Sequence, residues 1–551
     1  MRRFLNLEDK FSLSRAAVII GVLTLLSRVV GLMRDRLFAS HFGAGDTLDI
    51  YYAAFRIPDF IFNLLVLGTL SVAFIPVFTE WLIKDQKRAY KIANTILNFS
   101  FLAMLALCLM LTLLAKPLTH LLVPGFNGWK FEQTLLLTKI FLWSPVIFTV
   151  SNVFGSILNS QKRFFMANLA PILYNLGIIF GLIYLYPRFG LTGLGLGVIL
   201  GALLHLGVQA IEAFRHGFTW QPALELTDDS VKKIGKLFVP RIFGLDPSQI
   251  SLLIGSVIGS LLVSGTITVL NLANNLQAVP IGIFAISIAV AAFPLLSEQF
   301  ARRQHEDFAQ TLAKTMNQIL FFIIPISILM LLFRAYLVRL VYGAGKFNWE
   351  NTIATFNTLG IFAVSLFAQA LVPLFSRAFY ARHNTKTPVL VGLISMAINI
   401  TLSYWLATNQ LVFGVRALGA SLMAQTSGVE GIALGFSLAS IFNCLVLFIL
   451  LRHSLAKEFG KDQRPILEFD GALASGISRI VAASIIMGLA GYVAIYAIAP
   501  FVNTRTVLGI LLQSAWGVGL ATVVYLAAAD RLNLPQTKAA IAFFKKMFRL
   551  S

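Results

Sequence analysis

Residues 92–114 read IANTILNFSFLAMLALCLMLTLL and contain no charged side chain. This run exceeds the ~20 apolar residues that an α-helix needs to cross a bilayer. Similar runs recur from one end of the chain to the other. The segment therefore predicts one membrane-spanning helix in a series of such helices.

Fourteen such spans are expected along the chain. The composition agrees, since the 551 residues are 58% hydrophobic and only 12% charged, whereas a soluble domain is about one quarter charged. The predicted fold class is an all-α membrane protein of about 14 transmembrane helices. The spans lie near residues 16–38, 52–79, 92–114, 134–158, 165–186, 191–212, 237–263, 267–297, 315–334, 353–376, 388–407, 428–451, 478–500 and 507–529.

The net charge of +20 is explained by orientation in a membrane, so no nucleic-acid partner is expected. Most Lys and Arg residues fall in the segments on the side of the two termini, which predicts that both termini are cytoplasmic.

Cys108 and Cys444 fall inside apolar spans and are expected to be core residues. The first span carries Arg28 and Arg34 and is not expected to be a signal peptide.

Two matching pairs of segments indicate an internal repeat. Ala73-Phe-Ile-Pro-Val-Phe-Thr-Glu80 resembles Ala291-Ala-Phe-Pro-Leu-Leu-Ser-Glu298, and Gly190-Leu-Thr-Gly193 resembles Gly428-Val-Glu-Gly431. Each pair links spans six apart, which predicts two six-helix lobes related by a parallel pseudo-twofold axis, plus two C-terminal helices. The expected organisation is an N-terminal segment 1–15, an N-lobe 16–212, a linker 213–236, a C-lobe 237–451, a linker 452–477, a C-terminal pair 478–529 and a basic tail 530–551.

Charged residues at membrane depth mark a cavity or an internal partner. Arg28 lies about 20 Å along the first span from Arg15, too deep to reach the interface. One reading is a cationic cavity wall of Arg28 and Arg34. The other is an internal ion pair between Arg28 and Asp35, which lie on the same helical face.

The second and seventh spans add further charges with two readings each. Asp49, Arg56 and Asp59 either belong to the same cavity or are ordinary interfacial charges. In the seventh span, Arg241 either faces the cavity or extends to the interface. Asp246, which follows Gly244 and precedes Pro247, predicts an interrupted helix whose free carbonyls line a cavity.

Catalytic and nucleotide-binding motifs are absent from the sequence. It has no HExxH, no phosphate-binding loop of the Walker type, no GxSxG and no metal-ligand spacing among its seven His residues. We therefore expect a transporter with no catalytic residues, no metal and no cofactor. Its energy is expected to come from an ion gradient such as that of Na⁺, from the membrane potential or from the substrate's own gradient.

Several short motifs, in order along most of the chain, resemble those of the MurJ (MviN) lipid II flippases, members of the MOP exporter superfamily. They are Leu26-Ser-Arg-Val-Val-Gly-Leu-Met-Arg-Asp35, Phe42-Gly-Ala-Gly45 with Asp49, Ala73-Phe-Ile-Pro76, Pro124-Gly-Phe126, Ser248-Gln-Ile-Ser251, Tyr342-Gly-Ala-Gly-Lys-Phe347, Phe379-Tyr380 and Lys386-Thr-Pro388. The resemblance implies alternating access, a cationic central cavity for the pyrophosphate of lipid II, and a groove for its polyprenyl tail at 478–529. It also implies the bacterial inner membrane, with lipid II and membrane lipids as partners, and a monomer that works with the cell-wall synthesis machinery.

The resemblance also shows departures. The family commonly has an Arg pair in the second span, where this chain has Pro58, Asp59 and Asn63, and an Arg in the eighth span, where this chain has Asn275. The expected substrate-binding residues are Arg28, Arg34, Arg56, Arg241, Asn63 and Asn275, with Asp35, Asp49 and Asp59 as gating or charge partners.

An ion site and rival functions complete the expectations. Asp246, Asn399 and Ser403 offer oxygen ligands for Na⁺, although Asp246 could instead cap the broken helix. The leading function is lipid II flipping. The alternatives are export of another polyprenyl-linked glycan, or a channel or antiporter for small cations or drugs.

Overall fold

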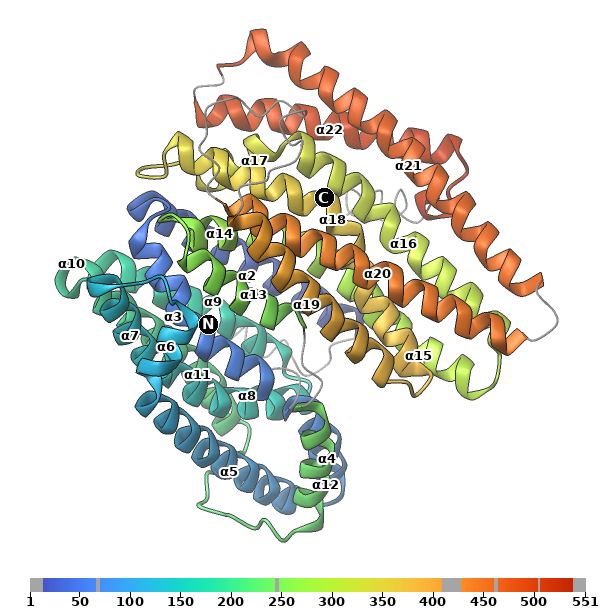
Figure 1. The fold of residues 1–551 in the computed structure, drawn as a ribbon. Helices are drawn as coiled ribbons and strands as arrows, with labels where there is room; N and C mark the ends of the chain where they lie inside the picture. The colour runs from blue at the N-terminus through green and yellow to red at the C-terminus, as the bar shows by residue number, and fades with distance from the viewer. Residues whose placement is uncertain are drawn as a thin grey trace. The chain divides into compact units, whose positions relative to one another are not determined.

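The structure is a computed structural model and describes residues 13–65, 70–242, 247–408, 428–459, 464–503 and 506–538. These residues are almost all helical and contain no β-strand (Figure 1). They belong to two compact units, each described here by itself. Unit 1 is Met1–Thr268 with Ala344–Phe347, and unit 2 is Val269–Gly343 with Asn348–Ser551. The lobe and linker boundaries given above stay a prediction.

Unit 1 holds the helices of the first half of the chain. They are α2 (Leu13–Phe42), α3 (Asp46–Leu65), α4 (Leu70–Lys84), α5 (Gln86–Leu113), α6 (Ala115–Leu122), α7 (Gly128–Phe141), α8 (Trp143–Ser160), α9 (Phe164–Phe180), the π-helix η1 (Gly181–Leu185), α10 (Tyr186–Phe189), α11 (Leu191–Arg215), α12 (Asp229–Ile242) and α13 (Pro247–Ser260).

Unit 2 holds the remaining helices, and only the first turn of α14 belongs to unit 1. They are α14 (Thr266–Pro280), the π-helix η2 (Ile281–Ile286), α15 (Ser287–Ala301), α16 (His305–Leu332), α17 (Arg334–Tyr342), α18 (Trp349–Ala381), α19 (Lys386–Thr408), α20 (Val429–Phe459), α21 (Arg464–Ile498), the 3₁₀ turn η4 (Ala499–Phe501) and α22 (Val507–Arg531).

Eleven stretches of described helix are long and apolar enough to cross a membrane. The other three predicted spans fall on α2, on α3 with α4, and on α12 with α13. The expectation of an all-helical, multi-pass membrane protein is therefore confirmed. The total of fourteen spans stays a prediction.

The stretch of sequence 92–114 lies in α5, and its two halves have different surroundings. Ile92, Ile96 and Leu97 are buried, whereas Leu109 and Leu113 are exposed. Aliphatic side chains that remain exposed on a helix of this length are suited to contact lipid tails. The N-terminal end of α5 is fixed by Asp85, whose carboxylate accepts hydrogen bonds from the backbone N–H groups of Lys87 and Arg88.

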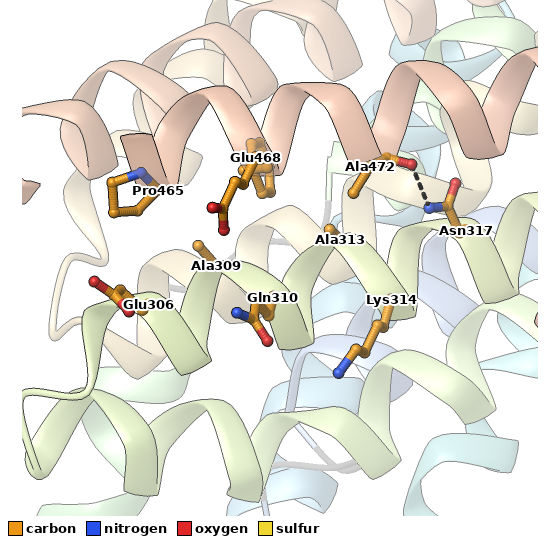
Figure 2. A pocket seen from close by; sticks show the side chains of 10 residues that line it. Glu306, Ala309, Gln310, Ala313, Lys314, Asn317, Pro465, Glu468 and Ala472 are labelled. Atoms are coloured by element: carbon orange, nitrogen blue, oxygen red, sulfur yellow. Dashed lines mark hydrogen bonds between the residues drawn. The ribbon is translucent and has the colours of Figure 1, made fainter. Parts of the chain in front are cut away.

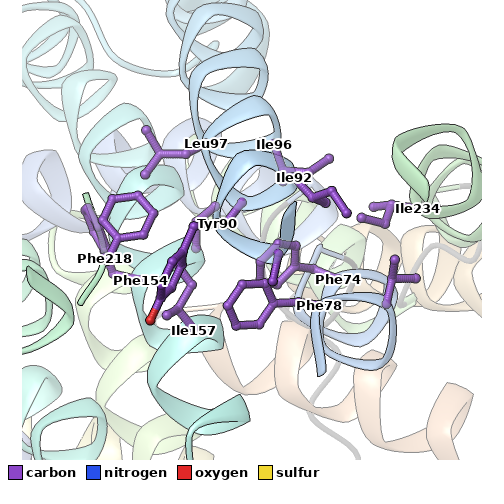
Figure 3. Close-up of a cluster of buried hydrophobic side chains, with 14 of the residues drawn as sticks. Phe74, Phe78, Tyr90, Ile92, Ile96, Leu97, Phe154, Ile157, Phe218 and Ile234 are labelled. Carbon is purple, nitrogen blue, oxygen red and sulfur yellow. The ribbon is translucent and has the colours of Figure 1, made fainter. Parts of the chain in front are cut away.

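The core of unit 1 is an apolar cluster that joins α4, α5, α8 and α12 (Figure 3). Phe74 and Phe78, one turn apart on α4, stack with ring centroids 5.0 Å apart, and Phe78 lies 6.2 Å from Tyr90 of α5. Phe154 of α8 packs edge-on against Phe218 at 5.4 Å. The Ala73-Phe-Ile-Pro76 motif thus places a fully buried aromatic ring, Phe74, in this cluster.

The segment between α11 and α12 runs along α5 and is tied to it by polar contacts. The Asn94 amide donates to the carbonyl of Thr219 and accepts from the backbone of Gln221, and the Asn98 amide donates to the carbonyls of Gln221 and Ala223. Burial acts to raise the pKa of Asp228, but hydrogen bonds from Ser230 and Arg88 outweigh it and hold that pKa below its usual value. This segment is ordered because α5 satisfies its backbone groups.

Local geometry repeats between the two halves of the chain, as the matching motifs predict. Glu80 pairs with Lys84 at 2.8 Å, and Glu298 at the equivalent position pairs with Arg302 at 2.8 Å. The turn after α8 places Lys162 at φ +61°, and the turn after α18 places His383 at φ +57°. These local matches agree with the predicted duplication, and the division into two lobes stays a prediction.

The second pair of matching motifs, Gly190–Gly193 and Gly428–Gly431, opens two helices that cross a neighbouring helix at close distance. On α11, a Cβ at Gly197 would lie 2.5 Å from the Cα of Gly181, and a Cβ at Gly201 would lie 2.5 Å from the carbonyl oxygen of Tyr174. On α20, a Cβ at Gly435 would lie 2.4 Å from the Ser403 hydroxyl of α19. Small residues therefore bring the backbones of each helix pair together, as is common in membrane helices.

Candidate functional site

An arginine cluster begins where α2 meets α9 in unit 1. The Nε and Nη2 groups of Arg34 donate to Asp35 Oδ1 at 3.0 and 2.7 Å, and Nη1 donates to Asn175 Oδ1 at 3.0 Å. Asn175 donates in turn to the carbonyl of Pro171, one turn earlier on α9. The Asp35 side chain is 5% exposed and that of Arg34 is 23% exposed. Arg34 is therefore held in a fixed orientation on both sides.

Arg28 lies about two turns before Arg34 on α2 and is half-buried. Among the described residues, none forms a hydrogen bond or an ion pair with its guanidinium. The internal ion pair between Arg28 and Asp35 that the sequence allowed is wrong, because Asp35 forms an ion pair with the adjacent Arg34. A cation at this depth without an internal partner remains available to a ligand.

The third arginine of the cluster comes from α3. Arg56 is buried, and its Nε donates to the Ser256 hydroxyl of α13 at 2.8 Å. Asp59 lies one turn further on and is exposed, and the Asn63 amide donates to its backbone carbonyl at 2.7 Å. Burial argues against the reading of Arg56 as an ordinary interfacial charge. Its role toward a substrate stays a prediction, as does that of Asn63.

The N-terminal end of α3 carries a polar latch, which we define as Asp46, Asp49, Lys130, Ser264 and the first turn of α14. Asp49 is almost fully buried and accepts from the backbone N–H groups of Gly265 (2.7 Å) and Thr268 (2.9 Å), and from the Thr268 hydroxyl (2.8 Å). Lys130 Nζ lies 2.6 Å from Asp46 and 3.3 Å from Asp49, and the Ser264 hydroxyl donates to Asp46 at 2.6 Å.

The chemistry of the latch is that of a helix cap joined to a shared lysine. Burial acts to raise the pKa of Asp46, but hydrogen bonds from Lys130 and Ser264 outweigh it and hold that pKa below its usual value. Asp49 satisfies N–H groups at the start of α14 that have no partner within the helix. All of these contacts lie within unit 1.

Two glycine motifs fix the backbone beside the latch. Gly345 has φ +57°, and a Cβ there would lie 2.2 Å from the carbonyl oxygen of Ser40, which accepts from the N–H of Lys346 at 2.8 Å. Gly265 has φ +91° and would meet the Ala44 carbonyl at 2.5 Å. Only glycine fits these positions, which explains the motif at 342–347 in physical terms.

The remaining predicted site residues fall on unit 2 or outside the described residues. Asn275 lies on α14 and is partly buried. The neighbouring Gln277 accepts from Gln369 of α18 at 3.0 Å, and Gln369 also reaches Ser365 at 3.0 Å, which contacts Ser437 of α20 at 3.0 Å. This buried amide and hydroxyl chain links three helices and was not expected from the sequence.

Asn399 and Ser403 do lie together, but they serve the packing of α19 on α20. The Ser403 hydroxyl lies 2.9 Å from Asn399 Oδ1 and 3.2 Å from the carbonyl of Ile432, and both side chains are buried. Asp246 lies outside the described residues, and the side chain of Arg241 is not among those described. The Na⁺ site and the role of Arg241 therefore stay predictions.

Lys130, Ser256 and Asn175 were missed by sequence reasoning. Each is a polar residue in or beside an apolar run, a signal that the sequence does contain. Lys130 also follows Pro124-Gly-Phe126 closely, and its ammonium lies 4.0 Å from the centre of the Phe126 ring. What the sequence lacks is the pairing, since each partner is more than 80 residues away.

Unit 2 contains an apolar groove, defined by residues of η2, α16, α21 and α22 and the turn that follows α22. Its volume is about 740 Å³. The Phe284 and Phe322 rings stack in its wall with centroids 4.7 Å apart. The lining residues are Phe284, Lys314, Gln318, Phe321, Phe322, Pro325, Ile326, Leu329, Met487, Thr522, Tyr525, Leu526, Pro535 and Gln536.

A multi-pass helical fold that carries arginines at membrane depth in unit 1 and an apolar groove in unit 2 fits the class of membrane transporters. The family model described as "Lipid II flippase MurJ" matches residues 38–512. The chain therefore belongs to the MurJ family of lipid II flippases.

Relatives and a solved structure agree with this membership. A probable lipid II flippase MurJ of Haemophilus influenzae is 27% identical over 532 residues, covering 91% of this chain and 96% of the relative. One from Vibrio cholerae is 29% identical, covering 79% and 82%. A structure titled as the lipid II flippase MurJ in an inward closed conformation superposes with a TM-score of 0.71 at 24% identity, covering 94% of this chain and 99% of that one.

A more distant structural neighbour shows how widely the fold is shared. An inward-facing multidrug resistance MATE transporter of the MOP superfamily superposes with a TM-score of 0.61 at 16% identity, covering 81% of this chain. Identities this low show the fold alone. The fold expected from the sequence is therefore confirmed by two different kinds of transporter.

Proposed function

We propose that this protein moves lipid II from the inner to the outer leaflet of the bacterial inner membrane by alternating access. Its family supports lipid II as the substrate. The observation that carries the proposal is Arg28, a membrane-depth guanidinium that no described residue pairs with. A planar guanidinium suits pyrophosphate because it donates two parallel, charge-assisted hydrogen bonds.

The two ends of such a substrate need different surroundings. Arg28, Arg34 and Arg56 in unit 1 supply cations for the pyrophosphate and headgroup. The groove in unit 2 has aromatic and aliphatic walls suited to the polyprenyl tail. Arg241 is proposed to add a further cation, in place of the family arginine that Asn275 replaces.

The latch bears on which end of the substrate pathway is closed. We propose that the latch closes the substrate pathway at the end of unit 1 where α3 begins, and that substrate enters from the opposite end. We propose that both termini are cytoplasmic, so that the closed end faces outward.

The energy for transport is proposed to come from the membrane potential or an Na⁺ gradient. The working unit is proposed to be a monomer that delivers lipid II to the cell-wall synthesis machinery.

The decisive experiment is depletion of the protein in its own host, followed by analysis of lipid-linked intermediates in the inner leaflet. Lipid II is expected to accumulate, and re-expression of the wild-type chain is expected to clear it. Accumulation of a different polyprenyl-linked glycan would replace lipid II as the substrate. Accumulation of no lipid-linked intermediate would contradict the proposal as a whole.

A further inference from the structure

Tyr51 of α3 carries a hydroxyl group that lies deep inside unit 1 without a partner. The residue is 4% exposed, and its oxygen atom is buried and forms no hydrogen bond with any described residue. Its ring packs between Phe38 of α2 and Phe141 of α7, with centroids 4.8 and 5.6 Å away. A phenylalanine would pack in the same way without the cost of burying an unbonded hydroxyl. The hydroxyl therefore contributes nothing to stability in this state of the protein.

The surroundings of this hydroxyl belong to the arginine cluster. Its oxygen lies within electrostatic range of Arg34 and Asp35. Phe38, which the Tyr51 ring contacts, follows Asp35 by three residues and so lies on the same face of α2. Tyr51 is therefore placed beside the ion pair of Arg34 and Asp35 without being bonded to it.

Unpartnered polar groups in unit 2 have simpler causes. In a cavity of about 270 Å³ between α16 and α21, the side chains of Glu306, Lys314 and Glu468 are exposed, so water satisfies them (Figure 2). The buried Oδ1 atom of Asn317 packs against Gly476, where a Cβ would lie 2.5 Å from it. Neither observation indicates a ligand, in contrast to an unbonded hydroxyl beside a buried ion pair.

Binding of pyrophosphate to Arg34 puts two anions in competition for one guanidinium. In this structure its Nε and Nη2 groups donate to Asp35 at 3.0 and 2.7 Å. The Arg34 side chain is 23% exposed and that of Asp35 is 5% exposed, so a phosphate can reach the arginine while water has little access to the carboxylate. A buried carboxylate that loses its donors is strongly destabilising. The exchange therefore requires a second donor for Asp35.

A tyrosine hydroxyl has the properties that such a donor needs. Its hydrogen rotates about the C–O bond and can turn toward a new acceptor. The group is neutral, so it does not compete with the arginines for the phosphate. A hydrogen bond from a neutral donor to a charged acceptor is also stronger than one between two neutral groups.

We propose that Tyr51 is a positioning residue for substrate binding: when pyrophosphate binds Arg34, the Asp35 carboxylate turns from the arginine to the Tyr51 hydroxyl. Arg34 then exchanges one anion for another, and the hydroxyl gains the partner that it lacks in the substrate-free state. No proton leaves any of the three side chains. The inference rests on the proposed function and adds an exchange step to its site.

The first test compares the affinity of the detergent-solubilised, full-length protein for lipid II, undecaprenyl pyrophosphate and undecaprenol. Tyr51→Phe should weaken binding of both pyrophosphate lipids by about 10- to 100-fold, the effect of one hydrogen bond to a charged group. Binding of undecaprenol should not change, because it has no phosphate to draw Arg34 from Asp35. Tyr184→Phe, at an exposed tyrosine of η1, is the matched control and should change none of the three affinities.

Melting temperatures separate this role from a folding defect. Tyr51→Phe should leave the melting temperature of the substrate-free protein unchanged or raise it, because the hydroxyl has no partner to lose. Tyr342→Phe should lower the melting temperature, because the buried Tyr342 hydroxyl donates to the carbonyl of Leu272 at 3.1 Å.

A double-mutant cycle on lipid II affinity identifies the acceptor. In the Asp35→Asn background no buried carboxylate has to be compensated when Arg34 binds the substrate. Adding Tyr51→Phe to that background should therefore weaken lipid II binding by no more than about threefold, far less than in the wild-type background.

Each contrary result has a distinct meaning. Unchanged lipid II affinity in Tyr51→Phe would overturn the exchange step and leave the proposed function intact. A fall in its melting temperature as large as that of Tyr342→Phe would also overturn the exchange step, since the hydroxyl would then have a structural partner. An equal loss of affinity in the wild-type and Asp35→Asn backgrounds would rule out Asp35 as the acceptor. Wild-type protein that binds lipid II no more tightly than undecaprenol would overturn the proposed function, and the inference with it.

Discussion

Arg28 and Arg34 lie on the same helix but differ in what surrounds them. Arg34 is engaged by Asp35 and Asn175, whereas no described residue pairs with Arg28. Replacing Arg34 removes donors from an almost fully buried carboxylate, and replacing Arg28 removes none. The two substitutions should therefore separate stability from transport.

We expect Arg28→Ala to abolish complementation of a depleted strain while leaving the amount and thermal stability of the folded protein unchanged. Arg34→Ala should lower stability by about 1–3 kcal/mol, the range for a buried acceptor that loses its donor. Arg28→Lys should restore only part of the function, because an ammonium cannot make the bidentate contact. Full complementation by Arg28→Ala would contradict the role assigned to it.

Asp49 and Asp46 allow a similar comparison in the latch. Asp49→Ala leaves the backbone N–H groups of Gly265 and Thr268 without acceptors in a buried site, so it should cost at least about 1–3 kcal/mol. Asp46→Ala, at a half-exposed position, should have a small effect on the melting temperature. Equal melting temperatures for the two variants would show that the buried cap contributes nothing.

The sequence predicted which residues are charged at membrane depth but not how they pair. Arg28 and Arg34 stood out because an apolar run makes any charge conspicuous. Asp35 lies within reach of either arginine by helical spacing, and the choice depends on Asn175, which comes from another helix. Pairings of this kind depend on tertiary packing, which one sequence does not contain.

At the scale of elements, the helices were predictable because apolar length is a strong signal. Breaks within spans were harder to predict. The sequence pointed to an interruption between Gly244 and Pro247, which stays a prediction because residues 243–246 lie outside the described residues. The π-helices η1 and η2 had no sequence signal, since their geometry depends on neighbours such as α11.

The α9–α11 crossing gives a prediction for an element. Gly197→Ala places a methyl group 2.5 Å from the Cα of Gly181, so the helices must separate. We expect a loss of about 1–3 kcal/mol in unfolding free energy, typical of overpacking, measured by thermal denaturation in detergent. Gly207→Ala on the same helix has open space around its Cβ and serves as the control. Similar stability of the two variants would show that this crossing is loosely packed.

At the scale of the molecule, the chain combines arginines at membrane depth with an apolar groove. Its fold is shared with a multidrug resistance transporter. The fold therefore does not select the cargo, and the side chains must. The arginines that the family resemblance implies for the second and eighth spans are absent from this chain, and the hydrogen bond between Gln277 and Gln369 lies near Asn275, the eighth-span position. Because Gln277 is buried and hydrogen bonded to Gln369, this amide pair is expected to stabilise the packing of α14 against α18 and not to replace the missing charge.

A reversible cross-link can test whether the latch opens during the transport cycle. The Ser264 hydroxyl and the Asp46 carboxylate are in hydrogen-bond contact, at 2.6 Å. In Asp46→Cys with Ser264→Cys, a disulfide should form under oxidation and abolish lipid II flipping in proteoliposomes, and a reductant should restore it. The native Cys108 and Cys444 are buried and can remain in place. Each single variant should flip at the same rate with and without oxidant. Undiminished flipping by the fully cross-linked protein would mean that this end of unit 1 stays closed throughout transport.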